Sequence, residues 1–179
     1  MTQEMEEPGA EKGRFRIVQN WQAMNEQDAA DLSEFWQRHG ALSGEELIRK
    51  RLSQVVVHAR TPEGEIAGVS TVDFAVVPQL DQPMYLYRSF IAPPWRKTLL
   101  VRRLFTASAS CLEEYARVHD YPAIGLIAVL ENSRFGEIAG RDRPVWGSGA
   151  MRQWTYIGKN AKGREMRVSY FKGARLKRS

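Results

Sequence analysis

The sequence contains histidine, cysteine and serine, the residue types that bind metals or act as nucleophiles, but their spacing matches no known metal-binding or catalytic motif. The three histidines, His39, His58 and His119, form no pair at helical or short-loop spacing, and Cys111 is the only cysteine. These residues exclude a disulfide framework and a cysteine-based zinc site. No serine lies in a G-x-S-x-G elbow, and residues 147–149 (GSG) lack the Gly-Lys-Ser/Thr ending of a P-loop. We therefore expect no bound metal, no serine nucleophile of the G-x-S-x-G kind and no P-loop for phosphate binding.

One acidic residue is placed as a general base could be. Asp73 lies in an otherwise apolar segment, residues 71–76 (TVDFAV). Burial of a carboxyl group raises its pKa, which suits the group to accept a proton near neutral pH. The plainer alternative is a residue on the solvated face of an edge strand.

The elements that must position these residues follow from hydrophobic periodicity. We predict a helix over 28–39 that ends at Gly40, and a short helix through Leu47 and Leu52 in which Ser43 is the N-cap and Glu46 completes a capping box. We also predict a long helix over 98–119, where apolar residues recur at three- and four-residue steps. The predicted strands cover 14–21, 54–60, 65–77, 84–91, 124–130, 153–157 and 165–171, with a short helix over 132–139.

This element order describes one domain without repeats or linkers. We expect it to span residues 14–172, between an acidic leader over 1–13 and a basic C-terminal tail over 173–179. The segment 124–130 is continuously apolar, which is typical of a strand buried on both faces and parallel to a neighbour.

One stretch carries the pattern of a known family. Residues 91–101 (IAPPWRKTLLV), followed by Leu104 and Phe105, are similar to the pattern V-x-P-x-Y-R-G-x-G-x-G that ends the fourth strand and opens the main helix in the GNAT superfamily of acyltransferases. The element order also resembles that family over about residues 14–172. The resemblance implies an α/β (α+β) fold: a mixed, mostly antiparallel sheet of six to seven strands, flanked by helices and splayed between the fourth and fifth strands.

The resemblance implies acetyl-CoA or another acyl-CoA as the acyl donor, an amine as the acceptor and no metal. In such a fold, backbone N–H groups at the helix start bind the pyrophosphate of CoA, and the helix dipole adds positive potential. The positions that match this role, together with an Asn after the fifth strand, are Phe90, Ile91, Arg96, Lys97, Thr98, Leu99, Leu100, Val101 and Asn132. Attack on the thioester also needs a base. The candidates on the central strands are Asp73, Tyr85, Tyr87 and Glu131, and of these we assign Asp73, Tyr87 and Glu131. For both tyrosines, ordinary packing in a strand is the favoured alternative.

Two features depart from the family pattern. Its three glycine positions are filled by Lys97, Leu99 and Val101, so the loop is a degenerate phosphate-binding loop. The tyrosine that protonates the leaving thiolate in the family would fall near Ala139, where there is none, so another group or water must supply that proton.

The charge distribution bears on possible partners. The net charge is +5, and nine Lys or Arg residues stand against Glu165 alone from residue 152 onward. A basic end favours an anionic partner, namely nucleic acid, a phosphorylated cofactor or an acidic acyl carrier protein, and the alternative is a solvated tail. We weigh three functions: an acyltransferase, a catalytically inactive GNAT-like domain that binds a ligand or protein, and a nucleic-acid-binding protein. The third ranks last because no reader motif is present. The resemblance also admits a homodimer paired through sheet edges.

The sequence also bears on the compartment. The longest uninterrupted apolar stretch, residues 124–130, is far shorter than the roughly 20 residues of a membrane-spanning helix. The acidic N-terminus lacks the apolar core of a signal peptide. We therefore expect a cytoplasmic protein without a membrane anchor.

Overall fold

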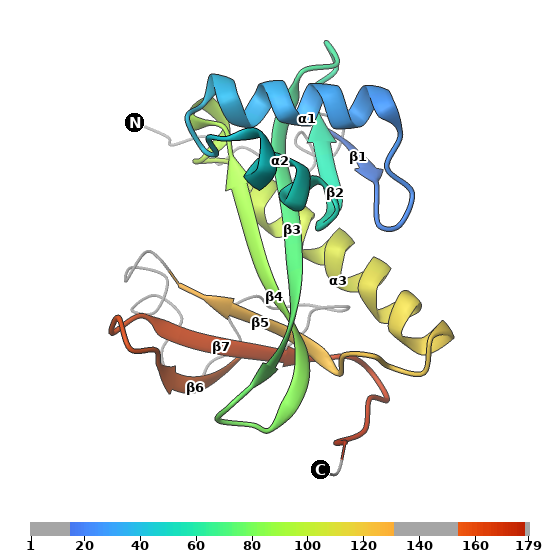
Figure 1. Ribbon diagram of the computed structural model, residues 1–179, viewed down its shortest axis with the longest axis vertical. Helices are drawn as coiled ribbons and strands as arrows, with labels where there is room; N and C mark the ends of the chain where they lie inside the picture. Colours follow the sequence, from blue (N-terminus) through green and yellow to red (C-terminus); the bar gives the residue numbers. More distant parts are fainter. Residues whose placement is uncertain (1–14, 131–153, 178–179) are drawn as a thin grey trace, which may run out of the picture. The chain divides into compact units, whose positions relative to one another are not determined.

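The computed structural model describes residues 15–130 and 154–177 (Figure 1). Along the chain the elements are β1 (Arg16–Gln19), α1 (Glu26–Arg38), α2 (Glu45–Leu52), β2 (Val55–Arg60), β3 (Ile66–Val77), β4 (Gln82–Ile91), the 3-10 helix η1 (Pro93–Trp95), α3 (Leu100–Val118), β5 (Gly125–Val129), β6 (Thr155–Lys159) and β7 (Glu165–Tyr170). The helix predicted over 132–139 lies outside the described residues. Among the helices described, none has the length and apolar character needed to cross a membrane.

The strands form one seven-stranded sheet in the order β1-β2-β3-β4-β5-β7-β6. Strand β5 pairs in parallel with β4, from Tyr85↔Leu126 to Tyr87↔Ala128, and antiparallel with β7. The pairs β1–β2, β2–β3 and β6–β7 are antiparallel. The prediction of a mixed, mostly antiparallel sheet with a parallel strand over 124–130 is therefore confirmed. Strand β4 runs on to Ile91, past the last residue that pairs with β5.

The chain divides into two compact units. The first unit comprises Met1–Thr71 and Ser89–Ser108, and the second comprises Val72–Arg88 and Ala109–Ser179. Strands β3 and β4 and helix α3 each contribute residues to both units.

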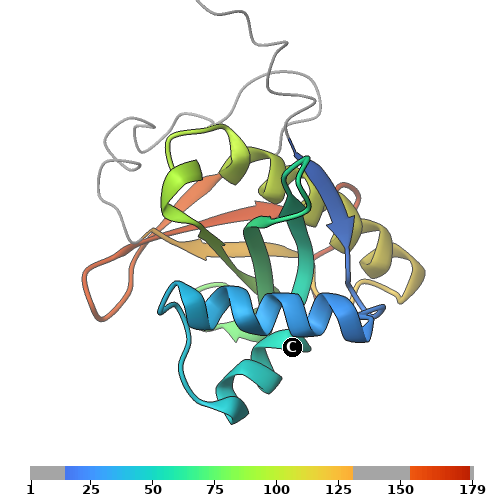
Figure 2. The same ribbon diagram turned by 90° about the horizontal axis from the view of Figure 1, so that it is seen from above.

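In the first unit, helices α1 and α2 lie on one side of β2 and β3, and the first half of α3 lies on the other (Figures 1 and 2). The alternation of side chains along β3 explains this arrangement. Val69 joins a buried cluster with residues of α1 and α2, whereas Gly68 and Ser70 face α3. The hydroxyl oxygens of Ser70 and Ser108 are 2.7 Å apart. The helix-side members of the buried cluster are Leu32, Phe35, Trp36 and Ile48.

The second unit has its own apolar core between β4, β5 and β7. The buried cluster consists of Val77, Met84, Ile124, Ile127, Met166 and Val168. Strands β5 and β7 approach closely at Gly125, where a Cβ atom would lie 2.4 Å from the carbonyl oxygen of Ser169. The chain after β7 is held by Gln82, whose Nε2 donates to the Lys177 carbonyl (2.8 Å) while its Oε1 accepts from the Lys177 N–H (2.7 Å).

Two predicted helix starts differ from the structure. Helix α1 begins at Glu26 rather than Asp28, because Asn25 is the N-cap and its Oδ1 accepts from the Asp28 N–H at 2.7 Å. The prediction of Ser43 as the N-cap of α2 is wrong. Gly44 occupies that position with φ +90° and without a side-chain capping bond, because glycine accepts this left-handed turn and thereby moves the helix start past Ser43.

Candidate active site at the β4–α3 corner

The predicted phosphate-binding stretch forms a tight corner between β4 and α3 in the first unit. Pro93 and Pro94 end the strand and open η1, since proline cannot donate to a strand ladder and fits the first turn of a helix. Thr98 then closes the corner. Its hydroxyl donates to the Trp95 carbonyl (2.7 Å) and accepts from the N–H of Leu100, the first residue of α3 (3.3 Å).

The corner presents unpaired backbone donors. Within the described part of the chain, the N–H groups of Leu99 and Val101 have no hydrogen-bond partner. The carbonyl of Leu99 is already used, because it accepts from the N–H groups of Arg102 and Arg103. Such N–H groups lie at the positive end of the helix dipole, which favours the binding of an anion.

The bulky residues of the loop do not all fill the corner. Leu100 is fully buried at 0% exposure, whereas Leu99 is 45% exposed and Lys97 is also exposed. Val101 is half-buried. The side chain that anchors the start of α3 is therefore Leu100, and two of the three residues at the glycine positions turn toward solvent.

Two cations of the loop stand at the same corner. The Nε of Arg96 donates to the carbonyl of Ile91 (3.1 Å), and its guanidinium lies 5.8 Å from the centre of the Phe90 ring. Lys97, next in the chain, is exposed. The predicted binding residues from Phe90 to Val101 are thus one contiguous stretch of the first unit, with donors and positive charge together.

Of the three predicted catalytic residues, the structure describes Asp73 and Tyr87. Asp73 lies half-buried on β3 and Tyr87 lies buried on β4, both in the second unit. Glu131 and Asn132 lie outside the described residues. Burial raises the pKa of Tyr85 to about 12. The roles assigned to Asp73 and Tyr87 stay predictions.

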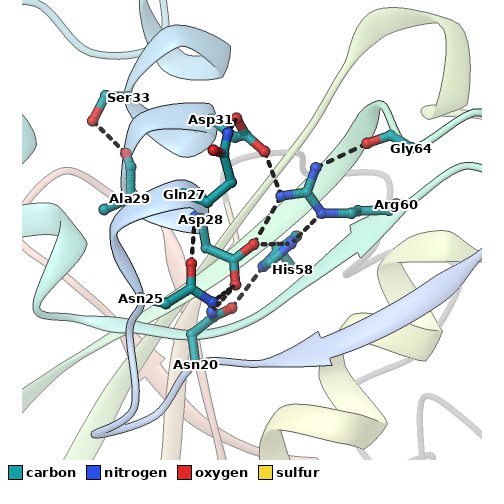
Figure 3. A network of polar contacts seen from close by, with 10 residues as sticks. All are labelled: Asn20, Asn25, Gln27, Asp28, Ala29, Asp31, Ser33, His58, Arg60 and Gly64. Atoms are coloured by element: carbon teal, nitrogen blue, oxygen red, sulfur yellow. Dashed lines mark hydrogen bonds and ion pairs between the residues drawn. The ribbon is translucent and has the colours of Figure 1, made fainter.

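A buried polar network in the first unit was not predicted from the sequence (Figure 3). Arg60 of β2 donates from Nη2 to Asp28 (2.8 Å) and to Asp31 (2.6 Å) of α1, and from Nη1 to the carbonyl of Gly64 (2.8 Å). Asn20 donates to Asp28 (3.0 Å), and its Oδ1 lies 2.6 Å from Nδ1 of His58. The network ties α1 to the first two strands.

Charges within this network offset one another. Burial lowers the pKa of His58 to about 4 despite the nearby carboxylate of Asp28. Burial alone would raise the pKa of Asp28, but the hydrogen bonds from Arg60 and Asn20 outweigh it and hold that pKa below its usual value. No group of three or more metal-ligating side chains occurs among the described residues. The network is therefore a structural clamp, since its polar groups are satisfied by one another.

Comparisons with known proteins agree with this geometry. No protein-family model matches the sequence, and no curated protein matches it. The ribosomal-protein-S5-alanine acetyltransferase of Vibrio fischeri superposes with a TM-score of 0.55 and 8% identity, over 90% of this chain and 96% of that one. Its similarity, together with the strand order and the parallel β4–β5 pair, decides the fold. The chain has the GNAT fold.

A second solved structure is similar over part of its length. The N-acetylglutamate synthase of Neisseria gonorrhoeae, complexed with coenzyme A and L-arginine, superposes with a TM-score of 0.51 and 12% identity. The alignment covers 93% of this chain and 34% of that one. At these identities the comparison concerns the GNAT fold and not the residues of the site. Lys97, Leu99 and Val101 thus belong to a chain that has the GNAT fold.

Proposed function

We propose that this protein transfers an acyl group from an acyl-CoA, acetyl-CoA being the simplest, to an amine. The observation that carries the proposal is the corner after β4, where unpaired N–H groups of Leu99 and Val101 stand with the exposed cations Arg96 and Lys97 at the start of α3. A pyrophosphate needs such a combination of donors, helix dipole and positive charge. The GNAT fold also supports the proposal, because in the resembled family this corner binds the pyrophosphate of CoA.

In the proposed reaction, the nitrogen of the amine attacks the carbonyl carbon of the thioester, and the carbon–sulfur bond breaks. The corner binds the pyrophosphate and so fixes the donor. A base must take a proton from the ammonium before attack, and Asp73, Tyr87 and Glu131 are the candidates proposed from the sequence. The leaving thiolate takes its proton from water or from a group still to be identified.

A second function is favoured by the filled glycine positions. Glycine lets a phosphate approach the backbone without a Cβ atom between them, and Lys97, Leu99 and Val101 all carry one. A chain that had lost close phosphate binding would keep the GNAT fold as a catalytically inactive domain that binds a ligand or protein.

Thermal unfolding with acetyl-CoA separates the two functions. At a concentration about 100 times Kd, a ligand that binds only the folded state adds about 2.7 kcal/mol, which for a domain of this size raises Tm by about 5–10 °C. We expect such a rise, with a longer acyl-CoA and a phosphopantetheine-loaded acyl carrier protein tested beside it. A flat response to all these donors contradicts the transferase and favours the binding domain.

Paired variants test the position of the site. The double variant Arg96→Ala/Lys97→Ala should weaken acetyl-CoA binding by about tenfold. The reason is that the two exposed cations together contribute about 1.4 kcal/mol to the binding free energy. The matched control is Arg49→Ala with Lys50→Ala, which removes two exposed cations from α2 of the same unit. Equal affinities for the two double variants would show that the corner is not the binding site.

A further inference from the structure

Strand β3 has a free edge in the second unit. Its neighbour β2 is the shorter strand and pairs with β3 only from Ile66 to Thr71, whereas β3 continues to Val77. Residues 72–77, all of the second unit, lie beside β4 on one side, and among the described residues no strand covers their other side. Alternate residues of an antiparallel strand direct their N–H and C=O groups to each side. This edge therefore offers backbone donors and acceptors to a further strand.

Two large apolar side chains of this edge face solvent. Phe74 is 54% exposed and Val76 is 55% exposed. They are two residues apart and so lie on the same face of the sheet, where the Phe74 ring packs edge-on against Tyr85 with centres 6.1 Å apart. Asp73, the one charged residue of the segment 72–77, points to the other face. An open edge with exposed apolar side chains is a template for pairing with another strand.

The two outer edges of the sheet are protected against such pairing. Strand β6 has a register shift between Tyr156 and Gly158 and ends at the exposed Lys159, and both bulges and lysines discourage the addition of a strand. Strand β1 is only four residues long, with an exposed polar residue at each end. Residues 72–77 contain neither lysine nor proline. Of the three edges, that of β3 is therefore the one best suited to accept a strand.

The same edge of a second copy is complementary to this one. In a two-fold antiparallel pair centred on Ala75, Phe74 of each copy lies opposite Val76 of the other, so that the exposed apolar side chains cover one another. An aromatic side chain opposite a β-branched one is a favourable cross-strand pair. The segment therefore supplies both the backbone groups and the side chains that its own edge requires.

Charge and burial select this register from its neighbours. Opposite residues of a continuous sheet share a face, so the two-fold axis must pass through a residue. An axis at Asp73 would set two carboxylates opposite each other, which is destabilising. An axis at Phe74 would set Val76 opposite Val72, which is already buried within its own copy. An axis at Ala75 sets Asp73 opposite Val77, and the two carboxylates are then separated along the edge.

We infer that residues 72–77 of β3 pair antiparallel with the same residues of a second copy, about a two-fold axis at Ala75. The strand pair β3–β4 of one copy then continues into that of the other. The inference rests on the edge of the second unit and not on the proposed function. A single short strand from each copy buries less than the roughly 1,200–2,000 Å² of a standard interface. The dimer is therefore reversible, with a dissociation constant on the order of 100 μM.

Sedimentation velocity of the full chain, from low micromolar to submillimolar concentrations, tests the pairing. We expect a dimer that forms as the concentration rises, and a loss of the dimer in Phe74→Glu/Val76→Glu. Mixing this variant with Phe74→Lys/Val76→Lys should restore a heterodimer, because each carboxylate then lies opposite an ammonium group. The matched control is Leu47→Glu/Val118→Glu, which replaces two apolar side chains that are 42% and 66% exposed elsewhere, and it should dimerise as the parent does.

Disulfide cross-linking tests the register, in a Cys111→Ser background that removes the free cysteine. Ala75→Cys places two thiols directly opposite each other, where Cα atoms about 4.5–5.5 Å apart suit a disulfide. Val76→Cys places the two thiols out of step, since position 76 of one copy lies opposite position 74 of the other. Mild oxidation should therefore cross-link Ala75→Cys at least about tenfold faster than Val76→Cys.

Four results would overturn the inference. A chain that is monomeric at every concentration leaves the edge to a strand of another protein. A dimer that persists in Phe74→Glu/Val76→Glu uses another surface, and loss of the dimer in Leu47→Glu/Val118→Glu as well shows no preference for this edge. Faster cross-linking at position 76 than at position 75 excludes the axis at Ala75. Circular dichroism of each variant confirms that a loss of the dimer does not come from unfolding.

Discussion

The Nε of Arg60 donates to Nε2 of His58 at 3.1 Å, while Nδ1 of the same ring lies 2.6 Å from Oδ1 of Asn20. The guanidinium of Arg60 can only donate, so Nε2 of His58 must be the unprotonated nitrogen that accepts, and Nδ1 donates to Oδ1 of Asn20. The arrangement thus fixes one neutral tautomer in a ring that is fully buried.

Stability should therefore depend on pH through His58. Burial lowers its pKa to about 4 in the folded protein, from 6.5 as a free side chain. Between these values the unfolded chain takes up a proton that the folded chain does not, so stability is fully present above pH 6.5 and falls as the pH drops toward 4. The loss is on the order of 3 kcal/mol. Urea unfolding across this range should show it, and His58→Gln should flatten the curve whereas His119→Gln should not.

Replacement of Arg60, the arginine of the buried network, should lower the free energy of unfolding strongly. Arg60→Met leaves the carboxylates of Asp28 and Asp31 without their shared cation, and the side chains of Arg60 and Asp28 are only 12% and 11% exposed. Loss of one partner of a buried pair costs about 3–5 kcal/mol. Arg49→Met breaks a pair with Glu45 in which the side chains are 76% and 91% exposed, and should cost less than about 0.5 kcal/mol. Comparable denaturation midpoints for the two variants would contradict the buried clamp.

The helix starts can be tested with two alanine variants. Asn25→Ala removes the side chain that accepts from the Asp28 N–H and should lower the free energy of unfolding by about 1 kcal/mol. Ser43→Ala should change it by no more than a few tenths of a kcal/mol, since Gly44 holds the N-cap position. Chemical denaturation of both variants gives the comparison. A larger loss in Ser43→Ala than in Asn25→Ala would restore the capping box predicted from the sequence.

Gly125 should tolerate no side chain. Its Cβ atom would lie 2.4 Å from the Ser169 carbonyl oxygen and 2.9 Å from the Tyr170 Cα, both backbone atoms that cannot move without shifting β7. Gly125→Ala should cost about 3 kcal/mol or more. At Gly68 the nearest atom is a Leu104 side-chain methyl at 3.1 Å, so Gly68→Ala should cost less. Thermal unfolding ranks the two variants, and the reverse order would mean that β5 and β7 lie further apart than described.

Most of the fold could be predicted from the sequence because the period of the hydrophobic residues indicates which side of each helix or strand is buried. The long helix over 98–119 matches α3 (Leu100–Val118), and the apolar run over 124–130 matches the parallel strand β5. The capping box at Ser43 failed because spacing alone cannot reveal the positive φ of Gly44. The buried network was missed because Asp28 and Arg60 lie far apart along the chain, on different elements, and only folding brings their side chains together.

The different surroundings of Leu99 and Leu100 have a consequence for substitutions in this loop. Leu99 is 45% exposed and Leu100 is fully buried, so a smaller side chain at position 99 leaves the packing of the helix start intact, whereas one at position 100 opens a cavity beneath it.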